Sequence, residues 1–140
     1  MDIKLAETDL EISRCYPVMA ELRPQLTEQE FRAQVRRQMK NGFQLAYVEA
    51  GNDIAAVAGF RLGESLAWGR FLYVDDLVTA EEQRSRGHGK KLMDWLLSHA
   101  REKGCGQLHL DSGVQRFAAH KFYLREGLII SSHHFARMVE

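Results

Sequence analysis

The segment Arg84-Ser85-Arg86-Gly87-His88-Gly89 lies where one sequence pattern gives way to another. Before it, the apolar-rich run from Leu66 to Val78 is typical of a β-strand. After it, apolar residues recur with helical spacing, and the members of this face are Leu92, Met93, Leu96, Leu97 and Ala100. That spacing predicts an amphipathic helix, from about Gly87 to Lys103, that packs on a sheet or on another helix. We therefore expect a strand, a loop and a helix, in that order, around this segment.

The predicted helix start is suited to binding an anion. The first N–H groups of a helix lack intrahelical partners and lie at the positive end of its dipole. Gly87 and Gly89 would let an anion approach the backbone closely. Basic side chains add positive charge beside them, namely Arg84, Arg86, Lys90 and Lys91. The segment predicts a cradle for a diphosphate, although a helix start whose glycines serve only the turn stays an alternative.

Two other phosphate-binding motifs fit the segment less well. A P-loop needs glycine five residues before its Gly-Lys pair and Ser or Thr after it, where Arg84 and Lys91 stand here. The dinucleotide fingerprint is closer, because the glycine pair opens a helix and Asp111 follows about twenty residues later. Leu92 replaces its third glycine, however, and the loop before the helix is longer than that fingerprint requires. The dinucleotide interpretation therefore stays open as a weaker alternative.

The remaining sequence reads as strands and helices on both sides of this junction. Before it, we expect helices over Glu11–Leu22 and from a capping box at Thr27 to about Asn41. The strands expected there are Ile3–Ala6, Phe43–Glu49 and Ile54–Leu62. After it come a strand, a helix and two final strands, at Leu108–Leu110, Val114–Glu126, Leu128–Ser131 and His134–Val139. The order predicts an α+β or α/β fold with one mixed sheet and helices on both faces, and the length fits a single domain over residues 1–140.

The composition narrows the class of protein. Lysine and arginine total 19, as do aspartate and glutamate, so the net charge is zero and nucleic acid is a poor candidate for a partner. The sequence shows neither a signal peptide nor an apolar run of membrane-spanning length, which favours a soluble, cytoplasmic protein without a membrane partner. Cys15 and Cys105 have no metal-ligand spacing and are expected to be reduced thiols. We also expect no metal site.

Three segments together resemble the GNAT superfamily of acetyl-CoA-dependent N-acetyltransferases. Arg84 to Gly89 is similar to its Arg-x-x-Gly-x-Gly signature, and Tyr73-Val74-Asp75-Asp76-Leu77-Val78-Thr79 resembles its central strand. Ala119 to Leu128 resembles the downstream motif Ala-x-x-Phe-Tyr-x-x-x-Gly-Phe. The element order of the whole chain is similar as well. The resemblance implies a mixed, mostly antiparallel sheet of six to seven strands, splayed at the centre, with about four helices on both faces.

The resemblance also implies a reaction. An acetyl group would pass from acetyl-CoA to a primary amine, on a small molecule or a peptide, by direct transfer in a ternary complex. Tyr123 corresponds to the acid that protonates the departing thiolate, and Asp75 or Asp76 to the general base. The positions implied to bind the coenzyme are Leu77, Val78, Thr79, Arg84, Arg86, Gly87, His88, Gly89, Lys90, Arg116, Ala119 and Phe122.

The general base is open between several residues. Adjacent strand residues face opposite sides, so only one of Asp75 and Asp76 should point into the cleft, unless a bulge intervenes. His133 and His134 are alternative bases with a suitable ordinary pKa. Arg116 stands where many relatives have asparagine, so the contact to the pantetheine arm can differ.

The acceptor amine cannot be read from the sequence, and two rival functions remain beside the enzyme. One is a non-catalytic acyl-CoA-binding regulatory module, which Tyr123 argues against because a binder needs no proton donor. The other is the dinucleotide-binding oxidoreductase fragment. A homodimer is compatible with the resemblance, since many relatives are dimers.

Overall fold

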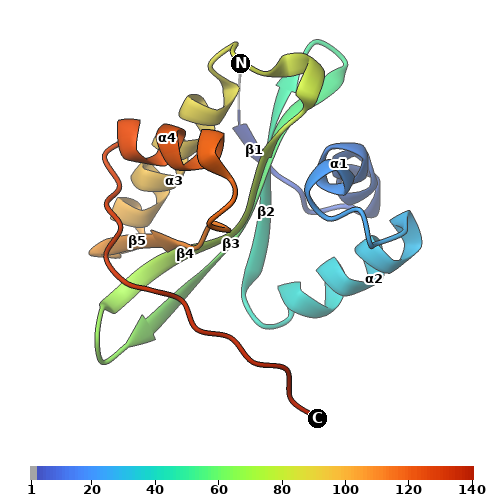
Figure 1. The fold of residues 1–140 in the computed structure, drawn as a ribbon. Helices are drawn as coiled ribbons and strands as arrows, with labels where there is room; N and C mark the ends of the chain where they lie inside the picture. The colour runs from blue at the N-terminus through green and yellow to red at the C-terminus, as the bar shows by residue number, and fades with distance from the viewer. Residues whose placement is uncertain (1–2) are drawn as a thin grey trace. The chain divides into compact units, whose positions relative to one another are not determined.

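The computed structural model describes residues 3–140 (Figure 1). The chain forms two compact units, the first ending at His109 and the second spanning Leu110–Glu140. The elements, in chain order, are β1 (Ile3–Leu5), α1 (Asp9–Leu22), α2 (Glu28–Met39), β2 (Phe43–Ala50), β3 (Asp53–Ser65), β4 (Gly69–Thr79), the 3₁₀ turn η1 (Glu81–Gln83), α3 (His88–Glu102), β5 (Gln107–Leu110) and α4 (Phe117–Arg125). The fold is therefore a mixed α/β fold with four α-helices.

One five-stranded sheet organises the first unit. Its order is β1-β2-β3-β4-β5, and the first four strands form antiparallel pairs with their chain neighbours. Helices α1 and α2 lie on one face of this sheet and α3 on the other (Figure 1). The predicted helices on both faces and the mostly antiparallel sheet are confirmed, but a sheet of six to seven strands is not.

Both N-terminal helices begin with a capping box. Thr27 accepts a hydrogen bond from the amide of Glu30, whose carboxylate accepts from the amide of Thr27. Thr8 and Glu11 form the same arrangement at the start of α1. Each box satisfies amides that the helix itself leaves without partners. The cap at Thr27 is confirmed, and the one at Thr8 adds to it.

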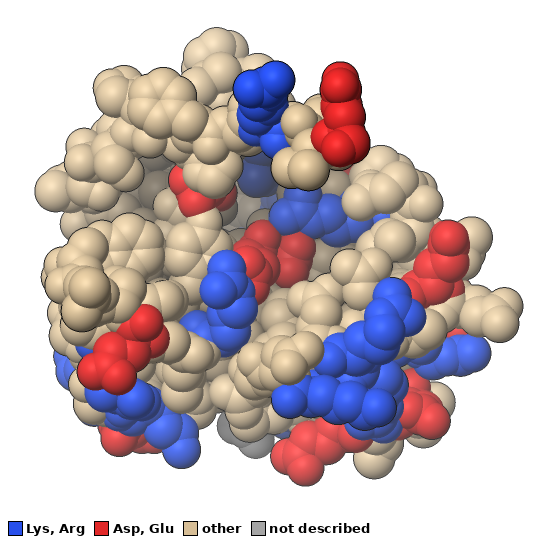
Figure 2. Space-filling model, turned by 90° about the horizontal axis from the view of Figure 1, so that it is seen from below, with Lys and Arg blue, Asp and Glu red and all other residues tan. Residues whose placement is uncertain are grey.

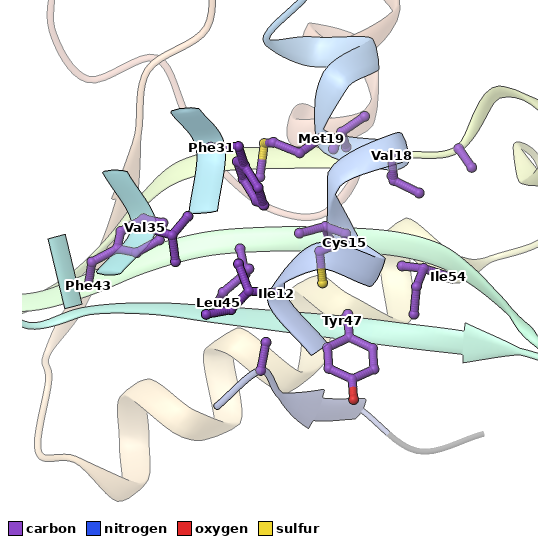
Figure 3. Packing of buried hydrophobic residues seen from close by; sticks show 14 residues of the cluster. Ile12, Cys15, Val18, Met19, Phe31, Val35, Phe43, Leu45, Tyr47 and Ile54 are labelled. Carbon is purple, nitrogen blue, oxygen red and sulfur yellow. The ribbon is translucent and has the colours of Figure 1, made fainter. Parts of the chain in front are cut away.

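The core on the α1 and α2 side is made of apolar side chains from both helices and the strands beneath them. Figure 3 shows Ile12 and Cys15 of α1 and Phe31 of α2 directed toward Leu45 and Tyr47 of β2. The four apolar residues among them are at most 3% exposed, and the Tyr47 hydroxyl donates to Glu11 Oε2 at 2.8 Å. This packing holds α1 against β2.

Helix α3 covers the opposite face with the apolar stripe that its sequence predicts. Leu92, Met93 and Leu96 are fully buried. Phe60 of β3 meets Trp95 and His99 edge to face, with ring centroids 5.8 and 5.4 Å apart. Only η1 and a short loop separate the end of β4 from the start of α3, and the glycine segment runs from this loop into the first residues of α3.

The second unit contains α4 and an extended C-terminal segment. Helix α4 begins at Phe117 rather than Val114, because residues 113–116 form a turn in which the Arg116 amide donates to the Gly113 carbonyl. The strands predicted at Leu128–Ser131 and His134–Val139 are wrong, since residues 128–140 adopt no regular structure. Alternating apolar residues do not make a strand unless its backbone finds a partner. Large side chains on the segment stay exposed, namely Ile129, Ile130, Phe135, Met138 and Val139.

No helix within residues 3–140 is both long and apolar enough to cross a lipid bilayer. Figure 2 shows basic and acidic side chains interspersed on the face it displays, neither sign covering it alone. This mixture agrees with the zero net charge of the sequence.

Candidate active site

A β-bulge in β4 shapes the centre of the site. Gly59 of β3 is paired with Asp76, while the next residue, Phe60, is paired with Val74, so Asp75 is the extra residue. A bulge of this kind bends the strand and redirects the side chains beside it. The strict alternation expected at Asp75 and Asp76 is therefore interrupted at these two residues.

Both carboxylates lie on the sheet face that carries α1 and α2. Asp76 packs over Gly59, and Asp75 binds Arg61, which is two residues further along β3 and so on the same face. The Arg61 guanidinium donates from Nε and Nη2 to Asp75 at 3.0 and 3.2 Å and lies 4.8 Å from the Tyr73 ring centroid. Asp75 is thus held in a two-point ion pair.

Asp76 has a different partner, from the end of α1. Arg23 Nε donates to Asp76 Oδ1 at 2.9 Å, and Arg23 Nη2 donates to the Asp75 carbonyl at 3.0 Å. One guanidinium therefore binds both the carboxylate and the backbone of the bulge. The Asp76 side chain is 16% exposed, compared with 26% for Asp75.

The surroundings of Asp76 alter its acidity. Burial raises the pKa of this carboxyl above its ordinary value, the Arg23 guanidinium acts in the opposite direction, and the neighbouring charge of Asp75 raises it further. A buried carboxylate with a raised pKa is a stronger base than an ordinary aspartate. Asp76 is therefore equipped to accept a proton.

Gly59 makes this arrangement sterically possible. A Cβ atom at this position would lie 2.6 Å from Asp76 Oδ2 and 2.5 Å from Cζ of Phe43. Both distances are well below van der Waals contact, so the carboxylate and the ring occupy the space that a side chain would take. A glycine inside a strand signals such a close approach, and this signal could have identified Gly59 from the sequence.

A pocket of about 140 Å³ lies beside Asp76. Its walls come from the end of α1, the following turn, one face of α2, and strands β2 and β4. The lining residues are Met19, Arg23, Gln25, Leu26, Phe31, Gln34, Val35, Gln38, Phe43 and Asp76. All belong to the first unit. The base candidate therefore has space for a small ligand next to it.

The end of β4 is paired on one side only. Leu77, Val78 and Thr79 pair with β3. On the other side, the Gly106 amide donates to the Arg70 carbonyl, near the first residue of β4, and β5 has four residues. A strand of that length starting beside Arg70 ends before it reaches Leu77. Within the first unit as described, the backbone groups of the last β4 residues that point away from β3 are thus not paired with β5.

The glycine segment forms the start of α3, as predicted. Gly87 is the N-cap with a φ of +84°, a left-handed conformation that favours glycine. Gly87 has no side chain to cap the helix, so the first amides of α3 receive no hydrogen bond from it. Arg84 and Arg86 are exposed, and Arg86 donates to Gln83 Oε1 at 3.2 Å. Lys90 pairs with Asp94 one helical turn later, at 3.3 Å.

His88 differs from the other residues of the segment. Its side chain is 4% exposed, and its Nδ1 atom has no hydrogen-bond partner among the described residues. Burial, together with the charges of Lys91 and Arg86, lowers the pKa of this imidazole. His88 is therefore neutral near pH 7 and offers an anion its backbone amide rather than its ring.

The second unit carries the remaining predicted residues. Tyr123 on α4 is buried, which raises the pKa of its phenol, while the charge and hydrogen bond of Arg116 oppose that rise. Arg116 is the N-cap of α4, and Ala119 and Phe122 are half-buried on that helix. Tyr123 therefore keeps its proton at neutral pH.

The histidines considered as alternative bases lie on the C-terminal segment. His134 Nδ1 is 3.4 Å from Asp111 Oδ1, and both side chains are largely exposed. His133 is exposed as well. Within residues 3–140, no three His, Cys, Asp or Glu side chains are grouped so as to hold a metal ion.

Comparison with known proteins decides the family. Residues 7–128 match the profile of the acetyltransferase (GNAT) family. The chain belongs to this family. This GNAT chain is 34% identical over 131 residues, 92% of each protein, to the uncharacterized N-acetyltransferase YhdJ of Bacillus subtilis (strain 168). The bulged strand and the glycine segment thus belong to a GNAT protein.

Solved structures agree with the GNAT fold. The aminoglycoside N-acetyltransferase AAC(6')-Iy in complex with CoA superimposes with a TM-score of 0.85 at 13% identity, over 99% of this chain and 93% of that one. The ribosomal-protein-alanine N-acetyltransferase of Brucella melitensis biovar Abortus 2308 gives a TM-score of 0.84 at 16% identity, over 99% and 100%. At such identities these structures support the fold of the GNAT chain, not its acceptor.

Proposed function

We propose that this GNAT protein transfers the acetyl group of acetyl-CoA to a primary amine, by direct attack of the amine on the thioester within a ternary complex. The observation that carries the proposal is the partly buried Asp76 carboxylate, held by Arg23 beside a pocket on the bulged strand. In this proposal residues 1–140 act together as a single acetyltransferase domain.

Asp76 is the proposed general base. It accepts a proton from the incoming ammonium, directly or through one water, and so frees the nitrogen lone pair for attack on the carbonyl carbon. Its raised pKa supports this role. Asp75 is a weaker candidate, because two hydrogen bonds from Arg61 occupy its carboxylate.

The backbone of β4 and the start of α3 are the proposed binding elements for acetyl-CoA. Among Leu77, Val78 and Thr79, the backbone groups that point away from β3 would bind the pantetheine arm and the thioester oxygen, where one well-placed N–H is worth roughly 3 kcal/mol to the transition state. The diphosphate would lie against the amides from Gly87 to Gly89, with Arg84, Arg86 and Lys90 as counter-charges. The left-handed Gly87 supports this assignment.

Tyr123 is the proposed general acid. It donates its phenolic proton to the departing coenzyme A thiolate as the carbon–sulfur bond breaks, while the acylated nitrogen gives up its second proton. Of the two protons that the ammonium loses, one goes to Asp76 and the other replaces the proton delivered to sulfur. Its retained proton supports the role. Arg116, Ala119 and Phe122, on the same helix or at its start, are proposed to line the coenzyme site.

Two measurements test the proposal together. Calorimetry should show that acetyl-CoA binds the wild-type protein and that Gly89→Val abolishes binding while circular dichroism stays unchanged. A panel of primary amines, followed by release of free coenzyme A thiol, should then give amine-dependent turnover. Tyr123→Phe should slow that turnover without weakening acetyl-CoA binding.

The outcomes separate the remaining alternatives. Tight acetyl-CoA binding without turnover of any amine would favour the non-catalytic acyl-CoA-binding module. Stabilisation by NADH but not by acetyl-CoA would favour the dinucleotide interpretation, which the family match does not support. Unchanged acetyl-CoA affinity in Gly89→Val would remove the glycine segment from the coenzyme site.

A further inference from the structure

The pocket beside Asp76 is lined by apolar side chains, by glutamines and by one ion pair. From α2 it receives Phe31, Gln34, Val35 and Gln38, which are spaced as neighbours on one helix face. Apolar side chains make up half of its lining, namely Met19, Leu26, Phe31, Val35 and Phe43. The remaining polar walls are three glutamines and the Arg23–Asp76 pair. The pocket is therefore half apolar and half polar, and its polar groups outside the Arg23–Asp76 pair are uncharged amides.

The two ionisable residues of the lining neutralise each other. Arg23 Nε is 2.9 Å from Asp76 Oδ1, and its Nη2 donates to the Asp75 carbonyl, so the guanidinium is committed to the bulge. The only carboxylate in the lining is Asp76, which the proposed reaction already uses as a base. A ligand that carries a second charge would find no unpaired counter-charge in these walls, whereas an uncharged polar group would find the amides of Gln34 and Gln38.

The glutamines offer hydrogen bonds to a neutral ligand. Gln34 Nε2 donates to Gln38 Oε1 at 2.9 Å, which orients the two amides relative to each other. This bond leaves the Gln34 carbonyl oxygen and the Gln38 amide group as an acceptor and a donor. An amide or hydroxyl group on the ligand would match them.

The volume sets a limit on size. The pocket measures about 140 Å³, whereas sites for drug-sized ligands measure roughly 300–1,000 Å³. A short chain fits within this space, whereas a body of several rings would extend beyond it.

We infer that the pocket holds the acceptor and selects a small primary amine whose only charge is the reacting ammonium, with an uncharged amide or hydroxyl group on its chain. The inference rests on the proposed function, since it places the ammonium at Asp76. Diamines, amino acids with a free carboxylate and aminoalkyl phosphonates would be poor acceptors. Gln34 and Gln38 are its specificity residues.

Three acceptors of nearly equal shape test the inference. They are 4-aminobutanamide, with a neutral end, 4-aminobutanoate, with an anionic end, and 1,4-diaminobutane, with a cationic end. With acetyl-CoA at saturation, kcat/KM should be highest for the amide, by about tenfold over each charged analogue, because its neutral end hydrogen-bonds to the glutamines and a charged end finds no unpaired counter-charge. A charged analogue whose kcat/KM equals or exceeds that of the amide would overturn the inference.

Variants then test which residues select the acceptor. Gln34→Glu or Gln38→Glu places a carboxylate in the pocket, so the ratio of kcat/KM for the diamine to that for the amide should rise by about tenfold. Gln29→Glu is the matched control, because it adds the same charge to α2 at an exposed residue outside the pocket lining. A ratio that does not change in the pocket variants, or that changes equally in the control, would overturn the role of these glutamines.

Failure of the inference can be distinguished from failure of the proposed function. Turnover of the diamine or of the amino acid in preference to the amide would refute the proposed acceptor class. It would leave the proposed acetyl transfer unaffected. Absence of turnover with all three, with the wider amine panel and with a lysine-containing peptide would overturn the proposed function itself. Acetylation of a lysine-containing peptide without any small-amine turnover would overturn the size limit.

Discussion

Arg23 and Asp76 are separated by 53 residues in the chain, and their side chains meet at 2.9 Å between Nε and Oδ1. The contact ties the last turn of α1 to the bulge of β4. The same guanidinium binds the Asp75 carbonyl, so the position of the proposed base and the shape of its strand depend on one side chain. Five predictions follow from this arrangement and from the packing around it, each with its own measurement.

The two adjacent aspartates should differ in their effect on catalysis. Asp76→Asn should lower kcat/KM for the amine by roughly 10²–10⁴-fold, because a carboxamide cannot accept the proton. Steady-state kinetics with acetyl-CoA and a good amine acceptor measure this effect. Asp75→Asn serves as the control and should lower kcat/KM by less than about tenfold. An equal loss in both variants would contradict the assignment of the base to Asp76.

Arg23 should set the pH at which the enzyme becomes active. The rate depends on ionised Asp76, so it should fall as the pH drops through the pKa of that carboxyl, which burial raises above the ordinary value. Arg23→Met removes the cation that opposes this rise, so the acid limb should move to higher pH. The pH dependence of kcat/KM gives the shift, and Arg23→Lys should recover part of it. If the acid limb of the kcat/KM profile lies at the same pH in Arg23→Met as in the wild type, Arg23 has no electrostatic role.

Gly59 should tolerate no side chain. In Gly59→Ala the new Cβ would lie 2.5 Å from Phe43 and 2.6 Å from the Asp76 carboxylate, so one of them must move. Overpacking of this kind costs about 1–3 kcal/mol of unfolding free energy, and the displaced carboxylate should lower turnover as well. Urea denaturation and steady-state kinetics measure the two effects. Gly106→Ala is the control, since a Cβ there meets no atom within 4 Å; comparable losses in both variants would argue against the close approach at Gly59.

The two cysteines should react at very different rates. Cys15 is fully buried, and burial raises the pKa of its thiol to about 12, so thiolate is scarce at neutral pH. Cys105 is partly exposed. A chromogenic disulfide reagent should therefore label one thiol per native chain rapidly and the second only in denaturant. Rapid labelling of both in the native protein would show that the α1 core is looser than the structure implies.

Glu11 should give the protein an acid-sensitive component of stability. Its pKa is lowered from 4.5 to about 2, first by the hydrogen bond from the Thr8 amide and then by that from the Tyr47 hydroxyl. A carboxyl with a lowered folded-state pKa stabilises the fold fully above its unfolded pKa, and this stability is lost as the pH falls from 4.5 toward 2. Glu11→Gln should lower the Tm at pH 7, by an amount that reflects about 1 kcal/mol, because hydrogen bonds to a charged acceptor are stronger than those to a neutral amide. The wild-type and variant Tm values should converge near pH 2, and a constant difference across that range would refute the linkage.

Much of the fold could be predicted from the sequence because its signals are local. The capping box of Thr27 and Glu30 involves residues three apart, and the apolar stripe of α3 needs only the helical period. The left-handed conformation of Gly87 follows from the lack of a Cβ atom. The glycine segment, the strand before it and the motif after it were sufficient to suggest the family.

The C-terminal strands could not be predicted in the same way. Apolar alternation at His134–Val139 is compatible with a strand, but a strand exists only where another backbone accepts its hydrogen bonds. The alternation of apolar residues does not specify which strand that partner is. For the same reason, the number of strands in the sheet was overestimated.

The candidate site shows the same division between local and long-range information. The sequence by itself determined that two carboxylates stand on the strand before the glycine segment, because both are neighbours in one motif. Only the tertiary structure decided that the bulge brings them to one face, that Arg61 holds Asp75, and that Arg23 holds Asp76. It also turned the His88 ring inward, leaving only its amide for an anion. These outcomes depend on strand register and on contacts between residues far apart in the chain, which neighbouring residues do not specify.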